Sequence, residues 1–322
     1  FAQTGPAIEL QAEVDGNTRT LTIGLGVEGT VQIDWGNGEK VTSEVIPAYD
    51  GYNQVNVFGT VSGDGKVKIY GDNIVYFECS SRVDGAQVLS LDVTKATTLK
   101  DLTANTNKLT AIDLTKNTEL EKLTINNNQL TSIDISKCTK LTTLDITNNL
   151  LTAIDITKNQ ALQTLRIGQN KLTGDLDLST NPTIKSVYAL TNELTSVKIG
   201  NNTASKPYFS FNYNKLTSID ASGINDAKNA TLFLIGNQLT EIKLPATQMK
   251  SLNITKNNFT LATLPAPSVA TFFTYAPQND YVIAESYKVG DVLDLSSQTS
   301  ATLNTQFAVY KSDKTALTEG TD

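Results

Sequence analysis

The middle of the chain repeats itself in rows of about 21 to 23 residues, and this period constrains the fold more than any other feature of the sequence. One asparagine marks each row, and successive asparagines are 21, 21, 21, 22, 22, 23 and 20 residues apart. They are Asn107, Asn128, Asn149, Asn170, Asn192, Asn214, Asn237 and Asn257. A row of this length cannot bury an apolar face alone, so consecutive rows are expected to stack into a solenoid with one continuous core.

The residues that precede each asparagine alternate between apolar and polar, which predicts a short β-strand. In one row, Leu120, Leu123 and Ile125 are the apolar residues that we expect to face the core. The chain then turns, and backbone groups inside the turn lack a sheet partner. Because an asparagine amide has two hydrogen-bond donors and one acceptor oxygen, it can satisfy such groups, and we predict a structural asparagine ladder.

The row pattern LxxLxLxxNxLTxIDLTKN resembles that of the leucine-rich repeat family, most closely the short, internalin-like repeats of bacterial surface proteins. The resemblance covers about residues 74 to 275. Rows of this length are too short for a full helix, so we expect a mainly β solenoid with 3₁₀ turns or extended segments on its convex side. Phe209 and Phe211 at leucine positions, and Pro277 at the asparagine position of the last row, predict local irregularity.

The segments on both sides of the repeat also read as β-structure. Residues 1–72 contain six alternating strand patterns separated by glycine-rich turns, which predicts a small β-sandwich that caps the solenoid of residues 73–275. Its stretch VQIDWGNGEKV resembles a strand-turn-strand of the polycystic-kidney-disease-type domain. Residues 276–322 are too few for a complete sandwich of about 100 residues. We interpret them as the truncated start of an immunoglobulin-like β module.

Composition excludes several kinds of chemistry. The chain has no histidine and only two cysteines, so it cannot build a Ser-His-Asp triad or a histidine- or thiolate-ligated zinc site. A net charge of -7 without a basic cluster argues against nucleic acid as a binding partner. The sequence contains no apolar run of about 18 residues, so no transmembrane segment is predicted. Asp101 and Asp145 are expected on one face but two rows apart, so we predict no enzymatic activity and no cofactor.

A column of aspartates follows the apolar residues of the convex segments. It consists of Asp92, Asp113, Asp134, Asp155, Asp177 and Asp220. Stacked carboxylates can collect calcium, but hydrogen bonds to the following turn are the simpler interpretation, so no metal site is predicted. Cys79 and Cys138 are interpreted as small buried apolar residues without a mutual disulfide.

The outward side chains of the predicted strands change from small and polar in early rows to aromatic and apolar in later rows. Exposed aromatic residues are typical of surfaces that stack on sugars or anchor a protein, so we predict a ligand-binding patch on the concave face. It contains Arg166, Tyr188, Leu190, Tyr208, Tyr213, Phe233 and Ile235. The alternative is that these side chains cover one another or that the row is distorted.

The resemblance implies a bacterial protein that is secreted or displayed on the cell surface and functions in adhesion or recognition. The opening FAQTG resembles the small-residue end of a cleaved export signal. We expect a monomer that binds a protein or glycan without catalysis. Two alternatives stay open, namely an architectural spacer that displays a further C-terminal module and a polysaccharide-capturing subunit of a nutrient-uptake system.

Overall fold

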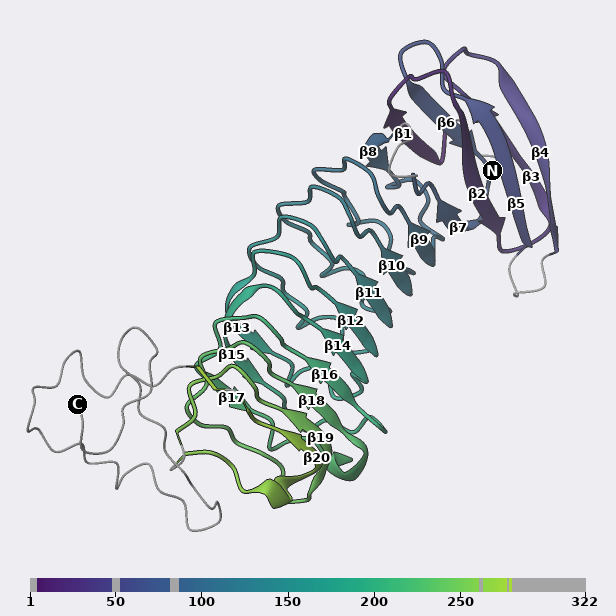
Figure 1. The fold of residues 1–322 in the computed structure, drawn as a ribbon. Coiled ribbons are helices and arrows are strands. Elements are labelled where there is room, and N and C mark those ends of the chain that lie inside the picture. Colours follow the sequence, from purple (N-terminus) through teal and green to yellow (C-terminus); the bar gives the residue numbers. More distant parts are fainter. Residues whose placement is uncertain (1–4, 48–52, 82–86, 261–262, 277, 280–322) are drawn as a thin grey trace, which may run out of the picture.

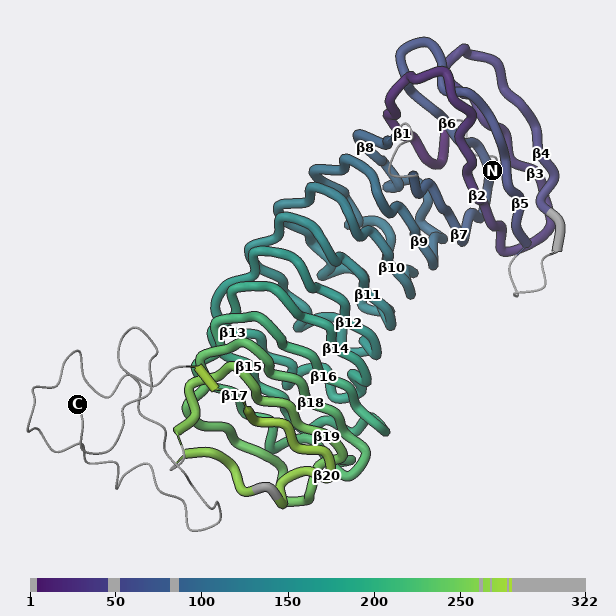
Figure 2. The backbone as a smooth tube through the Cα atoms, viewed as in Figure 1, coloured from purple at the N-terminus to yellow at the C-terminus, as the bar shows by residue number. Residues whose placement is uncertain are grey.

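The computed structural model describes residues 5–47, 53–81, 87–260, 263–276 and 278–279. These residues form an elongated solenoid with a group of antiparallel strands at its N-terminal end (Figure 1). Figure 2 shows the stacked coils of the backbone. Short parallel strands line one side of the solenoid, in the order β7 (Ile74–Glu78), β9 (Asp101–Thr103), β10 (Lys122–Thr124), β11 (Thr143–Asp145), β12 (Thr164–Arg166), β14 (Ser186–Tyr188), β16 (Tyr208–Ser210), β18 (Thr231–Phe233), β19 (Met249–Asn253) and β20 (Ala270–Thr274). The predicted mainly β solenoid is confirmed, whereas most of the predicted C-terminal module lies outside the described residues.

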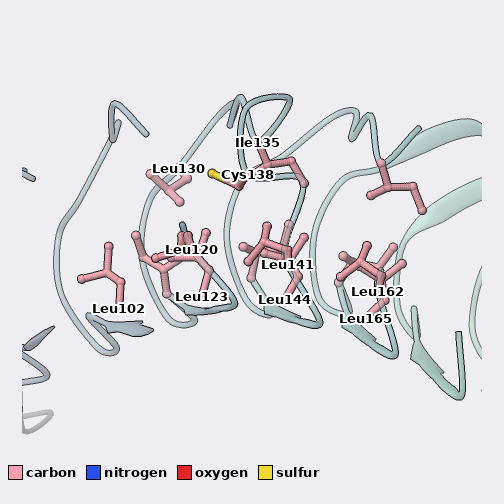
Figure 3. Close-up of a cluster of buried hydrophobic side chains, with 14 of the residues drawn as sticks. Leu102, Leu120, Leu123, Leu130, Ile135, Cys138, Leu141, Leu144, Leu162 and Leu165 are labelled. Carbon is pink, nitrogen blue, oxygen red and sulfur yellow. The ribbon is translucent and has the colours of Figure 1, made fainter. Parts of the chain in front are cut away.

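The core is a continuous column of aliphatic side chains because every row supplies the same apolar positions. The central residue of each three-residue strand of this sheet, such as Leu123 and Leu144, is fully buried. Figure 3 shows these leucines beside the strands and Leu130, Ile135 and Cys138 on the opposite wall. This regular filling keeps one coil above the next.

The opposite side of the solenoid consists of turns and short extended segments. In the later rows, β13 (Thr173–Asp177), β15 (Glu193–Lys198) and β17 (Ser218–Asp220) pair into a parallel three-stranded sheet. The two 3₁₀ turns in the described residues are η1 (Ala227–Asn229) and η2 (Pro267–Val269). No α-helix occurs in the described part of the chain, as the row length predicted.

The N-terminal strands merge with the solenoid at both of their outer edges. They are β1 (Ile8–Ala12), β2 (Thr18–Leu25), β3 (Gly29–Asp34), β4 (Lys40–Pro47), β5 (Asn53–Thr60), β6 (Lys66–Tyr70) and β8 (Val88–Asp92). Antiparallel pairing gives the order β7-β2-β5-β4-β3-β6-β1-β8. One edge, β7, continues into the parallel sheet through β9, and the other, β8, bonds to the next coil through Lys108 N and Val88 O at 2.9 Å. The buried residues of these strands form one hydrophobic cluster with those of the solenoid. The capping β-sandwich, its boundary at residue 72 and the polycystic-kidney-disease-type assignment stay predictions.

The row-marking asparagines make the same hydrogen bonds in every row. Asn149 Nδ2 donates to Ile125 O in the preceding row and to Ile146 O in its own row, both at 3.1 Å. Its Oδ1 accepts from Leu130 N at 3.0 Å. Equivalent bonds are made by Asn107, Asn128, Asn170, Asn192, Asn214, Asn237 and Asn257. Each amide thus joins two neighbouring rows.

A second column of buried asparagines, which the sequence did not indicate, lies on the convex side. Its members are Asn117, Asn159, Asn181 and Asn202. Asn159 Nδ2 donates to Ile135 O at 3.0 Å and to Cys138 O at 2.8 Å. Cys138 occupies the same column, with its Sγ 3.6 Å from Asn117 O. Both cysteines are buried free thiols, but Cys138 stands in a hydrogen-bonding position as well as an apolar one.

The irregularity expected in the row of Asn214 occurs before its strand, where Lys206 has a φ of +52°, and not in the strand itself. β16 pairs in register with β14 on one side and β18 on the other. Phe209 and Phe211 are fully buried and stack with their ring centroids 6.3 Å apart, so the two rings fill the core where leucines stand in other rows. In the last row the asparagine position is occupied by Gln278 and not by Pro277 as predicted, because Gln278 Nε2 makes the ladder bond to Ile254 O at 3.0 Å. Pro277 itself lies outside the described residues.

Replacement of Asn149 by alanine is expected to lower the free energy of unfolding by about 1 to 3 kcal/mol, because buried backbone groups of two rows lose their partners. The matched control is Asn148→Gly. Asn148 is exposed and has a φ of +55°, which glycine adopts without strain, so this change is expected to cost less than about 0.5 kcal/mol. Urea denaturation measures both, and equal losses would contradict the ladder.

Candidate binding surface on the strand face

The outward side of the parallel sheet, called the strand face below, presents side chains in straight columns because the strands pair in register. Arg166, Tyr188, Ser210 and Phe233 are successive members of one column. Tyr208 lies in the adjacent column on β16, between the rows of Tyr188 and Phe233. The central residue of each of these strands is buried, so the residues on either side of it point outward.

Four of the predicted site residues form a contiguous group, which we call the aromatic cluster: Arg166, Tyr188, Tyr208 and Phe233. The Tyr208 ring centroid lies 5.1 Å from that of Tyr188 and 5.6 Å from that of Phe233. The guanidinium carbon of Arg166 lies 4.5 Å from the Tyr188 ring centroid. The rings therefore cover one another in part, yet all three stay half-buried and keep accessible surface. Burial raises the pKa of Tyr208, so its hydroxyl remains a hydrogen-bond donor at neutral pH.

The other three predicted site residues flank this cluster. Leu190 and Ile235 are half-buried and follow Tyr188 and Phe233 by two positions along the chain. Tyr213 is different, because it lies in the turn after β16 and is 52% exposed. The structure therefore brings four of the seven together in direct ring contacts and places Tyr213 at the edge of the strand face.

Each row contains a residue in the left-handed conformation directly before the ladder asparagine, a feature that sequence reasoning missed. The φ angles lie between +54° and +69° at Thr106, Asn127, Asn148, Gln169, Thr191, Tyr213, Gly236 and Lys256. Asparagine and glycine tolerate this region best, and their presence at three of these positions was the available signal. Tyrosine is an unfavourable choice, so Tyr213 carries local strain that the row imposes on it.

The strand face near the N-terminal strands is charged. Asp101 is 8% exposed, and its carboxylate lies 3.2 Å from Lys122 Nζ. Burial raises the pKa of Asp101, and Lys122 opposes this shift. Asp145 lies in the other column and two rows away, so Asp101 and Asp145 form no acid-base pair.

The convex aspartates bond to their own turns. In five of the six, Oδ1 accepts from the backbone N–H two residues later at 2.7 to 2.9 Å, and in Asp220 the distance is 3.1 Å. Lys198 and Lys243 reach Asp177 and Asp220 of the preceding rows at 3.7 Å. In the described residues, no group of three or more acidic or cysteine side chains is arranged to hold a metal ion.

The repeat matches the family described as Leucine Rich repeats (2 copies) over residues 118–158. This segment contains leucine-rich repeats. It includes β10 and β11, and the strands on either side pair with them in register.

Three solved structures are similar to this leucine-rich repeat chain in fold. The functional domain of InlJ from Listeria monocytogenes, which includes a cysteine ladder, is 18% identical, with 74% of this chain and 69% of that chain covered and a TM-score of 0.37. A plant ice-binding protein is 20% identical, with coverages of 60% and 73% and a TM-score of 0.44. YopM, a leucine-rich effector protein from Yersinia pestis, is 20% identical, with 54% of each chain covered and a TM-score of 0.41. No curated protein sequence matches the chain.

Among the residues that the structure describes, no helix has the length and apolar character needed to cross a membrane.

Asp101 and Asp113 are expected to affect stability in opposite directions. Burial raises the pKa of Asp101 in the folded state. Protonated Asp101 therefore contributes to the free energy of unfolding, and this contribution is lost as the pH rises through the folded-state pKa. Hydrogen bonds from Thr115 lower the pKa of Asp113, so the stability tied to its ionised form is present at neutral pH and lost as the pH falls through the folded-state pKa. We therefore expect Asp101→Asn to raise the melting temperature at neutral pH and Asp113→Asn to lower it.

Both differences should become smaller as the pH falls, and the Asp113 difference should disappear only below its lowered folded-state pKa, where the carboxyl is protonated in the folded and unfolded states. Thermal melting of the two variants and the parent chain from neutral to acidic pH measures the effect. A decrease for Asp101→Asn at neutral pH would show that its ion pair with Lys122 outweighs burial.

Proposed function

We propose that this protein is a non-catalytic recognition protein, secreted or displayed on the surface of a bacterium, that binds a protein or glycan through the strand face. The aromatic cluster carries the proposal. Three rings from β14, β16 and β18 contact one another there and keep surface open to solvent. Aromatic side chains exposed together cost solubility, and a ligand that covers them recovers this cost.

The scaffold suits binding because it is ordered before a ligand arrives. Leucine-rich repeat solenoids are typically protein-binding scaffolds with extended surfaces. Here the strands beneath the cluster pair in register and their central residues are fully buried. Little conformational entropy is lost on binding when the contact residues stand on such rigid strands.

The absence of histidine from the sequence and the separation of Asp101 from Asp145 support a role without catalysis. The exported bacterial location is inferred from the resemblance of the row pattern to internalin-like repeats. A spacer that only displays a neighbouring module is the competing proposal, and it predicts that the cluster is dispensable.

The proposal is tested by screening the chain against arrays of glycans and extracellular proteins beside a triple variant, Tyr188→Ala, Tyr208→Ala, Phe233→Ala. We expect a ligand whose affinity falls at least about tenfold in the triple variant, because the loss of three ring contacts removes more than about 1.4 kcal/mol of binding free energy. Thermal melting verifies that the variant folds.

Phe58→Ala is the matched control. Phe58 is 66% exposed on β5, which is separated from β14 by β2, β7, β9, β10, β11 and β12. Its removal deletes exposed aromatic surface without touching the cluster. No ligand in either array, or a ligand that the triple variant binds as tightly as the parent chain does, would favour the spacer.

A further inference from the structure

We propose that the ligand of the aromatic cluster is a neutral polysaccharide and that Tyr213 is a stacking platform for one of its sugar rings. This inference rests on the proposed function and specifies its ligand class. It follows from the distribution of charge along the strand face and from the conformation and surroundings of Tyr213.

Charge divides the strand face into two parts. Each of the strands β9 to β12 contains one charged residue, namely Asp101, Lys122, Asp145 and Arg166. The next three strands, β14, β16 and β18, contain none. The aromatic rings lie in this uncharged part. Arg166 on β12 borders it on one side, and β19, which contains Lys250, borders it on the other. A protein partner is typically recognised with the help of complementary charges, whereas a neutral glycan needs none.

Small hydroxyl side chains lie beside the rings. Ser186 and Thr231, both half-buried, are the in-register neighbours of Tyr208. Ser210 lies in the column between Tyr188 and Phe233 but is buried. A sugar ring presents an apolar C–H face and a rim of hydroxyls, so aromatic faces interleaved with small hydroxyl side chains match both of its surfaces.

Tyr213 extends this surface at the edge of the sheet. Its backbone N–H donates to Ile235 O at 2.7 Å, which fixes the tyrosine beside the row of Phe233. Its ring lies against Gly236, where an added Cβ would stand only 2.7 Å from Tyr213 Cδ1. The missing side chain at residue 236 thus leaves the space that the ring occupies, while 52% of Tyr213 remains exposed.

A tyrosine is an unusual residue for the backbone conformation at position 213. Its φ is +56°, and the other rows place threonine, asparagine, glutamine, glycine or lysine at this position. The left-handed conformation belongs to every row, so what distinguishes this row is the choice of an aromatic residue, which adopts such a conformation rarely. An exposed ring that lies against a glycine, one row from Phe233, is suited to stacking on a sugar.

Affinity electrophoresis tests the inference, with laminarin, xyloglucan, mannan and amylopectin as neutral probes and polygalacturonate as the anionic probe. The variants are Tyr213→Asn, which suits the left-handed backbone without a ring, and Tyr213→Phe, which keeps the ring. Phe58→Thr is the control for loss of an exposed aromatic residue elsewhere. Thermal melting of each variant verifies folding.

At least one neutral polysaccharide is expected to retard the parent chain, with little change between about 0.05 and about 0.5 M NaCl. Tyr213→Asn should weaken this binding about tenfold, whereas Tyr213→Phe and Phe58→Thr should retain it. Failure of all neutral probes, or binding to polygalacturonate alone, overturns the ligand class. Full binding by Tyr213→Asn overturns the platform. A protein ligand lost in the triple variant, without any polysaccharide binding, would leave the proposed function intact and refute this inference alone.

Discussion

A buried side-chain amide that bonds to the backbone of two rows is the interaction on which the solenoid depends. Each short strand is followed by a turn that carries backbone groups into the core, where neither water nor a sheet partner reaches them. Asn149 satisfies such groups in its own row and in the preceding row. Because one amide spans both rows, it also fixes how one coil sits on the next.

In-register pairing of the parallel strands also separates the residues that pack in the core from those that face outward. Buried positions such as Leu165, Val187 and Phe209 are constrained by packing, whereas outward neighbours such as Arg166 and Tyr188 keep accessible surface. Aromatic residues therefore accumulate over β14, β16 and β18 without disturbing the core. Parallel in-register pairing then brings rings from successive rows within 5.1 to 5.6 Å of one another. A surface of this kind varies independently of the fold that supports it.

The sequence was sufficient to predict the period, the stacked strands and the outward facing of Tyr188 and Phe233, because these follow from an alternating apolar pattern. It was insufficient for features that depend on backbone dihedrals or on burial of polar groups. Asn117 and Asn159 belong to a Thr-Lys-Asn segment that looks solvent-exposed, yet both are fully buried. The left-handed residue of each row has no single residue type, so Tyr213 gave no sign of its conformation. At Phe209 the size of the side chain suggested a distorted strand, yet β16 pairs in register with the strands on both sides.

The division of charge on the strand face also explains where binding is favourable. A ligand that covers Asp101 or Lys122 must remove water from ionised groups, and these two groups already satisfy one another at 3.2 Å. A ligand that covers Tyr188, Tyr208 and Phe233 displaces water from rings instead, which favours binding. The charged part and the uncharged part belong to the same sheet. The proposed ligand is therefore directed to the uncharged part by the cost of desolvation alone, without a conformational change. The charged strands β9 to β12 are thus less suited to the proposed recognition than the uncharged strands β14, β16 and β18.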